Sequence, residues 1–423
     1  MKGFFSDSQI KKTTTTGSAR CVKCGLYKTC LSPRMEPTGE GRKKILFVAE
    51  APGEKEDKRN KQLIGDAGQL LRKVLRKEGI DLDIDCRKIN STNCRPPKNR
   101  EPSDDEIAFC RPNVFKEIES FKPHIIILMG KAAIKSVIGS FWKKDLGTVT
   151  SWRGWTIPDR SLNAWICPTF HPSYIQRNGG EEHVSHLIFC QDIKKFLKFI
   201  DKPLPKFHDE SKDVEIIVSE KGANLYLKDV FRQRPDWISF DYETTGLKPH
   251  AQGHEIVTCA ICDGKRTGAF LAHYQSVQDS LIRILRNKMI RKSAHNLKFE
   301  QSWTKEIYGC DVEGWLWDSQ IAAHILENRE LITSLKFQTY VNFGVADYDS
   351  HIKPYLEGVE KNNANSFNRI HELSKTELLT YNGLDSIYGY KLTEKQMEQL
   401  GKSSLEFMEM IADPSFFIRR PGK

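Results

Sequence analysis

Short apolar runs alternate with amphipathic stretches along the first half of the chain. Residues 44–49, 123–130 and 164–170 are apolar runs of strand length, set off by polar, Pro or Gly positions. The stretches at 67–77 and 131–138, which follow two of these runs, predict helices. Strands that alternate with helices predict an α/β layer fold.

The second half begins a new α/β pattern. Apolar runs predict strands at 237–241, 255–261 and 267–272. Helices are expected at three places, about 277–289, 317–327 and 374–399. The stretch between the two patterns contains two prolines and many charges, which is typical of a linker between domains. We therefore expect a polar disordered arm at 1–20, a first domain at 21–200, a linker at 201–213 and a second domain at 214–423.

Composition narrows the class of protein only slightly. The 423 residues are 39% hydrophobic, which is enough for two or three domain cores, and the net charge of +10 is compatible with a polyanionic partner. No apolar run reaches about 18 residues, so no membrane span is expected. The polar start lacks the apolar core of a secretory signal. The cytoplasm is therefore the expected location, where eleven cysteines favour metal ligation over disulfides.

Two carboxylates lie close together at the end of the strand predicted at 237–241. Asp241 and Glu243 are two residues apart, so they point to the same face of the strand. Two neighbouring negative charges are costly unless a cation neutralises them, and magnesium and manganese prefer oxygen ligands. The pair therefore suggests a divalent metal site, and the alternative is that both side chains simply face solvent. Glu300, Asp385 and Tyr381, one helical turn before Asp385, complete a plausible two-metal centre for phosphodiester chemistry.

The three segments that carry these residues resemble the motifs of the DnaQ-like, or DEDD, exonucleases over about residues 230–400. The tyrosine four residues before Asp385 resembles the Tyr subclass, typical of proofreading domains of family A DNA polymerases. The resemblance implies a ribonuclease H-like domain in which two Mg²⁺ or Mn²⁺ ions are held by Asp241, Glu243, Glu300 and Asp385. It also implies that Tyr381 positions the attacking water.

One residue departs from that pattern. Glu300 stands where the family usually has aspartate, and its longer side chain displaces the carboxylate by about 1.5 Å, a misplacement that can cost about a hundredfold in rate. A domain that binds DNA without cutting it is the alternative. Asp318, on the segment that follows, is expected to cap a helix.

The first half carries clustered cysteines. Cys21 and Cys24 form a CxxC pair, and Cys94 and Cys110 follow later in the chain. Four thiolates in two groups can hold zinc or an iron–sulfur cluster, and the spacing does not choose between them.

The motifs around these cysteines resemble the iron–sulfur uracil-DNA glycosylases of family 4 over about residues 18–200. They are Ala49-Glu-Ala-Pro-Gly, Asp66-Ala-Gly-Gln-Leu-Leu, Asn93-Cys-Arg-Pro-Pro-Lys-Asn-Arg-Glu-Pro and His171-Pro-Ser-Tyr-Ile-Gln-Arg. The resemblance implies a uracil-DNA-glycosylase-like three-layer α/β/α domain. It also implies a [4Fe–4S] cluster on Cys21, Cys24, Cys94 and Cys110.

The same resemblance assigns roles in excision of flipped uracil. Glu50 would lie beside the attacking water or the sugar, and His171 would stabilise charge on the uracil oxygen. The uracil pocket would consist of Ala51, Pro52, Gly53, Leu63 and Asn90, with Asn90 reading the edge of the base. Two departures weaken this picture, because Ala49 replaces a glycine and Leu63 replaces a phenylalanine that stacks on the base. Base–aromatic stacking is worth about 1–3 kcal/mol, so both an active glycosylase and a retained uracil-sensing module remain open.

Both halves thus indicate DNA as the partner. Their combination resembles the front portion of phage-type family A DNA polymerases. The first hypothesis is a 3′–5′ exonuclease of the proofreading type, acting on single-stranded or frayed 3′ ends, with an N-terminal uracil-recognising domain. Such a protein would be part or partner of a DNA polymerase. The alternatives are a repair enzyme that also excises uracil and a non-catalytic DNA-binding accessory.

Overall fold

The computed structural model describes residues 18–401, which form two compact units. The first unit contains the described residues up to Phe207 together with Tyr340–Asp347, and the second contains His208–Thr339 and the described residues from Tyr348 onward. The main division falls inside the segment predicted as a linker, whereas the return of Tyr340–Asp347 to the first unit was not predicted. Within the described residues, no helix is both long and apolar enough to cross a bilayer.

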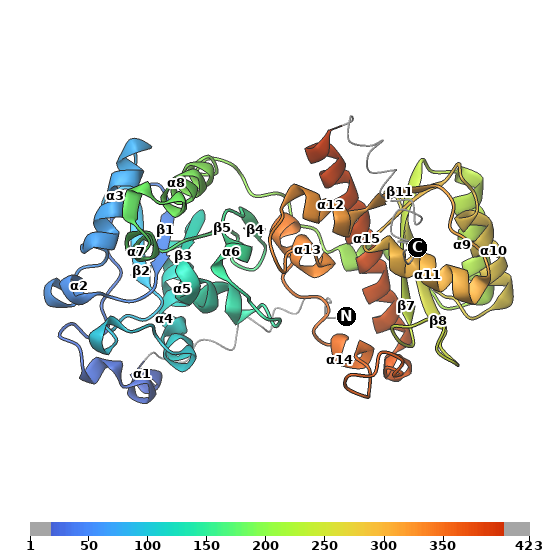
Figure 1. The fold of residues 1–423 in the computed structure, drawn as a ribbon, viewed down its shortest axis with the longest axis horizontal. Coiled ribbons are helices and arrows are strands. Elements are labelled where there is room, and N and C mark those ends of the chain that lie inside the picture. Colours follow the sequence, from blue (N-terminus) through green and yellow to red (C-terminus); the bar gives the residue numbers. More distant parts are fainter. Residues whose placement is uncertain (1–17, 402–423) are drawn as a thin grey trace, which may run out of the picture. The chain divides into compact units, whose positions relative to one another are not determined.

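The first unit is built on a five-stranded sheet with the order β2-β1-β3-β5-β4 (Figure 1). Its strands are β1 (Ile45–Ala49), β2 (Cys86–Asn90), β3 (Ile125–Met129), β4 (Ile157–Asp159) and β5 (Ala164–Thr169). All pairs are parallel except β4 with β5. The three apolar runs predicted as strands are confirmed as β1, β3 and β5, which are buried throughout. Such continuous burial is typical of parallel strands covered by helices on both faces.

Helices cover both faces of this sheet, as a three-layer α/β/α domain requires. They are α1 (Ser18–Cys24), α2 (Glu54–Arg59), α3 (Asp66–Lys77), α4 (Asp104–Phe121), α5 (Gly130–Val137), α6 (Val149–Trp152), α7 (Pro172–Arg177) and α8 (Val184–Leu197). The alternate residues Ile45 and Phe47 of β1 join a core cluster with apolar side chains of α3, α7 and α8. Helix α5 contacts β1, β3 and β5, and α4 packs on α5 (Figure 1).

The disordered arm predicted at 1–20 overlaps the first helix by three residues. Residues 1–17 lie outside the described residues, but Ser18 to Arg20 are the first turn of α1. Helix α1 packs against α4, a contact between segments far apart in the chain. The local sequence is polar and gives no sign of this contact.

The segment Tyr340–Asp347 completes the first unit. The Tyr340 hydroxyl donates a hydrogen bond to Oδ2 of the buried Asp159 over 3.0 Å. The Tyr340 ring lies 5.7–6.0 Å from three aromatic rings, those of Phe141, Trp142 and Trp152. The first unit is therefore discontinuous in sequence.

The second unit is built on a six-stranded mixed sheet with the order β11-β10-β7-β8-β9-β6. Its strands are β6 (Val214–Ile217), β7 (Trp237–Thr244), β8 (Ile256–Cys262), β9 (Thr267–Leu271), β10 (Arg291–Ala294) and β11 (Trp315–Asp318). Its helices are α9 (Glu220–Gln233), α10 (Gln275–Leu285), α11 (Leu297–Tyr308), α12 (Ser319–Leu326), α14 (Lys353–Leu356) and α15 (Lys375–Leu400), and α13 (Leu335–Phe343) begins in this unit.

The long helix α15 covers one face of this sheet and contacts β6 to β10. Helices α9 and α10 pack against β7 and β8 on the other face. The strands predicted at 237–241, 255–261 and 267–272 are confirmed. The helix predicted at 317–327 begins two residues later, because Trp317 and Asp318 end the edge strand β11. This layered mixed sheet agrees with the predicted ribonuclease H-like fold.

Candidate active sites

The alternation of side chains along β7 sorts core residues from polar ones. Phe240 and Tyr242 enter the core cluster shared with α9 and α10, so Asp241 and Glu243 point to the opposite face, which is covered by α15. Asp385 projects from α15 onto the same place. One carboxylate oxygen from each of Asp241, Glu243 and Asp385 lies within 4.8 Å of the others. The structure thus brings together three of the four predicted metal ligands.

The fourth predicted ligand, Glu300, lies nearby but outside that group. It is in the first turn of α11 and is 2% exposed. Its Oε2 atom is buried without a hydrogen-bond partner among the described residues. Burial and the charges of Asp241 and Asp318 raise the pKa of Glu300 well above its ordinary value. A buried carboxylate oxygen without a donor is suited to a cation or a cation-bound water.

The electrostatics of the three clustered carboxylates also fit a divalent cation. Burial, followed by the charge of Asp385, raises the pKa of Asp241 well above its ordinary value. Burial, followed by the charges of Asp241 and Asp385, does the same for Glu243. Like charges held this close favour protonation unless positive charge is supplied, and oxygen ligands are those that Mg²⁺ and Mn²⁺ prefer.

Local capping fixes the helix that carries Glu300. The Asp318 carboxylate, predicted to cap a helix, accepts hydrogen bonds from backbone amides at the starts of two helices. The donors belong to Asn296 and Leu297 before and in α11, and to Gln320 and Ile321 in α12. The capping prediction is confirmed, and this shared cap sets the starting point of α11.

Several partners of these carboxylates were not predicted from the sequence, among them Asn382 and Tyr348. The Asn382 amide donates to Oδ2 of Asp241 over 2.7 Å, while its own Oδ1 accepts from the Thr258 hydroxyl over 2.9 Å. The Tyr348 hydroxyl donates to Oδ1 of Asp385 over 2.6 Å. Asn382 was detectable, because it lies between Tyr381 and Asp385 on their helix. Tyr348 lies in a segment without a recognisable motif.

Two exposed apolar side chains belong to segments that follow or contact the end of β7. Leu247 follows Glu243 by four residues and is 67% exposed. Phe367 is 47% exposed, and its ring stacks on His254 with centroids 4.3 Å apart. The neighbouring Asn368 is bonded through its backbone amide to the carbonyl of Thr245, just after Glu243 in the chain. Exposed apolar and aromatic groups of this kind are suited to stacking on unpaired bases.

The predicted glycosylase residues gather at the carboxyl edge of the first unit's sheet. Glu50 follows β1, Asn90 ends β2, and His171 follows β5. Gly130, at the end of β3, has a φ of 84°, and a Cβ placed there would lie 3.0 Å from the Cβ of His171. Parallel strands bring their carboxyl ends to the same edge, which is the usual place for a site in an α/β sheet.

His171 is held in one orientation. Its Nδ1 accepts a hydrogen bond from the backbone amide of Ser173 over 3.2 Å, which leaves the ring proton on Nε2 when the imidazole is neutral. Burial lowers the pKa of His171 to about 4, so the ring is neutral at pH 7. The buried Nε2 atom has no partner among the described residues. It is therefore a free donor for an oxygen of a bound base.

Glu50 has the opposite shift. Burial, followed by the charge of Glu101, raises the pKa of Glu50. A partly buried carboxylate with a raised pKa is suited to acid–base chemistry near neutral pH.

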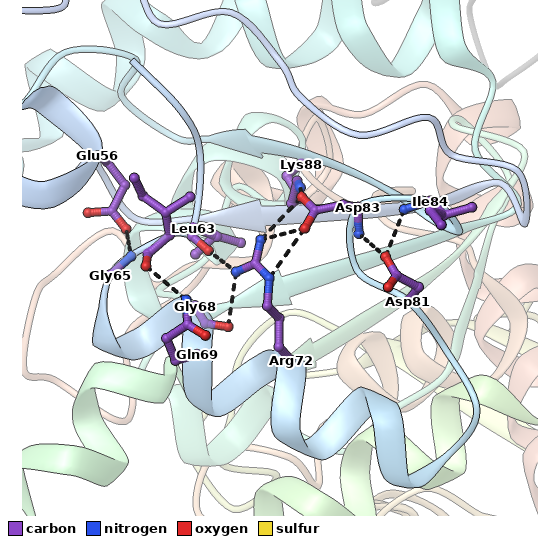
Figure 2. Close-up of polar contacts among 11 residues, drawn as sticks. Glu56, Leu63, Gly65, Gly68, Gln69, Arg72, Asp81, Asp83, Ile84 and Lys88 are labelled. Carbon is purple, nitrogen blue, oxygen red and sulfur yellow. Dashed lines mark hydrogen bonds and ion pairs between the residues drawn. The ribbon is translucent and has the colours of Figure 1, made fainter. Parts of the chain in front are cut away.

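The loop that carries Leu63 is fixed by side chains around it (Figure 2). Leu63 has a φ of 52°, a left-handed conformation that is strained for leucine. Arg72 donates to the Leu63 carbonyl and is anchored by Asp83, and Glu56 accepts from the backbone amide of Gly65 over 2.7 Å. The Leu63 side chain is 5% exposed and packs into the core. It offers no aromatic face to a base.

The amide predicted to read uracil already has a partner. Asn90 donates from Nδ2 to Oε1 of Gln62, which is completely buried. The Gln62 amide in turn donates to the carbonyl of Glu36 over 3.3 Å. Gln62, a residue that the sequence pattern did not single out, thus takes one of the two N–H donors of the Asn90 amide.

The four predicted cluster ligands line one pocket. Cys21 and Cys24 come from α1 and Cys110 from α4, which pack together, and Cys94 follows β2. Backbone amides donate to two of the sulfurs over 3.2 Å, from Arg34 to Cys94 and from Asn93 to Cys110. Such bonds stabilise thiolates that hold a cluster.

The distances between the four thiols can be compared with those expected around a single zinc ion. Among the described residues, no three of these sulfurs lie within 4.8 Å of one another. The sulfurs around one zinc ion, each about 2.3 Å from the metal, lie closer together than that. The thiols are therefore more widely spaced here than the four ligands of one bound zinc ion.

Comparison with known proteins assigns both units. Residues 36–200 match the model of the uracil DNA glycosylase superfamily. The type-4 uracil-DNA glycosylase of Thermotoga maritima is 37% identical over 200 residues, which are 47% of this chain and 98% of that protein. The chain belongs to the type-4 uracil-DNA glycosylase family. Its glycosylase unit, residues up to 207, carries this relationship.

The second unit has a different relationship. Residues 208–400 match the model of a 3′–5′ exonuclease family, so they form a 3′–5′ exonuclease domain. The DNA polymerase of Bacillus phage SP01 is 24% identical over an alignment of 324 residues that covers 69% of this chain but 33% of that protein. That match is longer than the glycosylase unit and therefore continues into the exonuclease domain. Escherichia coli RNase D, a solved structure, aligns at 17% identity with a TM-score of 0.36 over 47% of this chain and 50% of that protein.

Proposed function

We propose that this glycosylase-family chain is a metal-dependent 3′–5′ exonuclease that removes nucleotides from DNA 3′ ends. The observation that carries the proposal is the group of three carboxylates from Asp241, Glu243 and Asp385 within 4.8 Å, in a domain of the 3′–5′ exonuclease family. These residues would hold two Mg²⁺ or Mn²⁺ ions, with Glu300 reaching one through water. Such ions polarise the phosphodiester and activate the attacking water.

Tyr381 supplies the remaining polar group. Burial, followed by the charges of Asp385 and Glu243, raises the pKa of Tyr381 well above its ordinary value. The phenol therefore keeps its proton at neutral pH and donates a hydrogen bond. That donor would orient the attacking water on the face of the phosphate opposite the leaving strand.

The substrate we propose is a single-stranded or frayed 3′ end. The exposed Leu247 and Phe367 provide apolar surfaces for the terminal bases. The relative from phage SP01 is a DNA polymerase, which supports a role for this chain as part or partner of a polymerase in the cytoplasm. The glycosylase unit, with a [4Fe–4S] cluster on Cys21, Cys24, Cys94 and Cys110, would recognise uracil in the same DNA.

Asn382→Ala tests how Asp241 is positioned. Without the amide, nothing in this network holds the Asp241 carboxylate, and a shift of about 1 Å in a reacting group can cost about a hundredfold in rate. We expect kcat for digestion of a 3′-labelled single strand in Mg²⁺ to fall by about that factor. The melting temperature should also fall somewhat, because the buried Thr258 hydroxyl loses its acceptor. Asn224→Ala, on α9 across the sheet, is the matched control. Unchanged kcat in Asn382→Ala would assign this amide a purely structural role.

A second function, excision of uracil, is favoured by the neutral His171 with its free donor and by the raised pKa of Glu50. If this function is present, the wild type forms abasic sites in uracil-containing DNA in EDTA, where metal-dependent digestion is silent. Glu50→Ala should slow that reaction by at least about a hundredfold, the usual contribution of a general base. Glu119→Ala, at an exposed position of α4, should not. Binding of uracil-DNA without abasic product would make the unit a recognition module.

A further inference from the structure

A lysine forms an ion pair with one member of the carboxylate group in the exonuclease domain. The Lys336 ammonium, carried by α13, forms an ion pair with Oδ1 of Asp385, and its side chain is 12% exposed. Its Nζ atom also lies 4.0 Å from the centroid of the Tyr348 ring and 4.4 Å from that of Tyr381. A lysine held this way has lost most of its water and depends on the carboxylate and the two rings for compensation.

The oxygen that Lys336 contacts is doubly engaged. Oδ1 of Asp385 accepts from the Tyr348 hydroxyl over 2.6 Å as well as from the ammonium. A divalent ion needs lone pairs of carboxylate oxygens at about 2.0–2.2 Å and repels an ammonium at the same oxygen. Lys336 and a metal ion on that oxygen therefore exclude each other.

The charge of Lys336 also reaches the other two carboxylates. It acts to lower the pKa of Asp241 and of Glu243, against the larger effect of burial and against their mutual repulsion. The ammonium thus partly compensates the negative charge of all three carboxylates, as a bound metal ion would.

We propose that Lys336 is a built-in counter-ion of the exonuclease site, which competes with a divalent ion for Asp385. The inference rests on the proposed function in taking these carboxylates as the metal site. Its consequence is regulatory, because the site binds metal more weakly than three unpaired carboxylates would. The exonuclease then depends more steeply on the concentration of free metal.

Direct measurement of Mn²⁺ binding to the full chain tests this proposal without DNA. Electron paramagnetic resonance of free Mn²⁺ at one fixed pH gives the dissociation constant. Lys336→Met should bind Mn²⁺ at least about tenfold more tightly than the wild type, because a competing charge has been removed. Lys336→Arg, which keeps the charge, and Lys288→Met, at an exposed ion-paired position, should stay near the wild type. Asp241→Asn should abolish Mn²⁺ binding at this site, both in the wild type and in Lys336→Met.

Equal or weaker Mn²⁺ binding in Lys336→Met overturns the proposal. A second measurement needs no variant, and so does not depend on the folding of Lys336→Met. Acetylation of lysines in the wild type, read by mass spectrometry, should modify Lys336 faster in Mg²⁺ than in EDTA, since displacement frees the amine from Asp385. An unchanged rate also overturns the proposal.

These outcomes are separate from those of the digestion assay. A chain that shows tighter Mn²⁺ binding in Lys336→Met but digests no DNA would disprove the proposed exonuclease function and leave the counter-ion in place. If the wild type digests DNA and Lys336→Met binds Mn²⁺ as the wild type does, the counter-ion proposal is disproved and the exonuclease function stands.

Discussion

Asp241→Ala is expected to abolish metal-dependent digestion of DNA 3′ ends. Asp241 is one of the two carboxylates that β7 contributes to the group of three, and one oxygen from each of Glu243 and Asp385 lies within 4.8 Å of one of its oxygens. Asp241 would help hold the catalytic ions, and its loss should remove several kcal/mol of transition-state stabilisation, which corresponds to a fall in rate on the order of a thousandfold or more. The measurement is the rate of nucleotide release from a 3′-labelled single strand in Mg²⁺ or Mn²⁺.

The controls for this variant separate chemistry from folding. Asp279→Ala removes an exposed carboxylate from α10 on the other face of the sheet and should leave the rate unchanged. Binding of a 3′ single strand in EDTA should survive Asp241→Ala, because the exposed apolar side chains remain. Nucleotide release that persists in Asp241→Ala would disprove the assignment of this site.

Cys94→Ser is expected to give the second large effect. A serine hydroxyl is a poor substitute for a soft thiolate ligand, so the glycosylase unit should lose the iron–sulfur cluster that we propose for it. The wild type should be brown with a broad visible absorption band, and the variant should be nearly colourless. Loss of a tightly bound group costs several kcal/mol, so the melting temperature of this unit should fall by roughly 5–10 °C.

Cys30→Ser is the matched control, because Cys30 lies close to Cys94 but does not line the cavity of the four predicted ligands. It should keep both the colour and the melting temperature. A colourless wild type that contains zinc would contradict the cluster assignment. Retention of the absorption band in Cys94→Ser would remove Cys94 from the ligand set.

The sequence predicted those parts of the fold that depend on local pattern. Strands β1, β3 and β5 were found because they are apolar throughout. Strand β2 was missed because it contains Arg87 and Lys88, whose charges are neutralised by Glu117 and by Asp83 from outside the strand. Lys88 is completely buried, a placement that only the tertiary structure explains.

In the sites too, the residues identified by local spacing were predicted, whereas those that depend on tertiary contacts were not. Asp241, Glu243, Tyr381 and Asp385 were predicted because their spacing places each pair on one face of a strand or helix. Lys336 and Gln62 were not, since each acts through a partner distant in the sequence. Their contribution depends on which residue the fold brings opposite them, Asp385 in one case and Asn90 in the other.

The discontinuity of the glycosylase unit has a consequence for its synthesis. Asp159 and the aromatic rings around it receive Tyr340 only after the ribosome has translated residues 208–339 of the other unit. At translation rates of about 5–20 residues per second, that delay is on the order of ten seconds. During this interval the nascent glycosylase unit has a buried carboxylate without its tyrosine donor and an unfilled aromatic pocket. The exonuclease domain must therefore begin to emerge before its predecessor in the chain has finished folding.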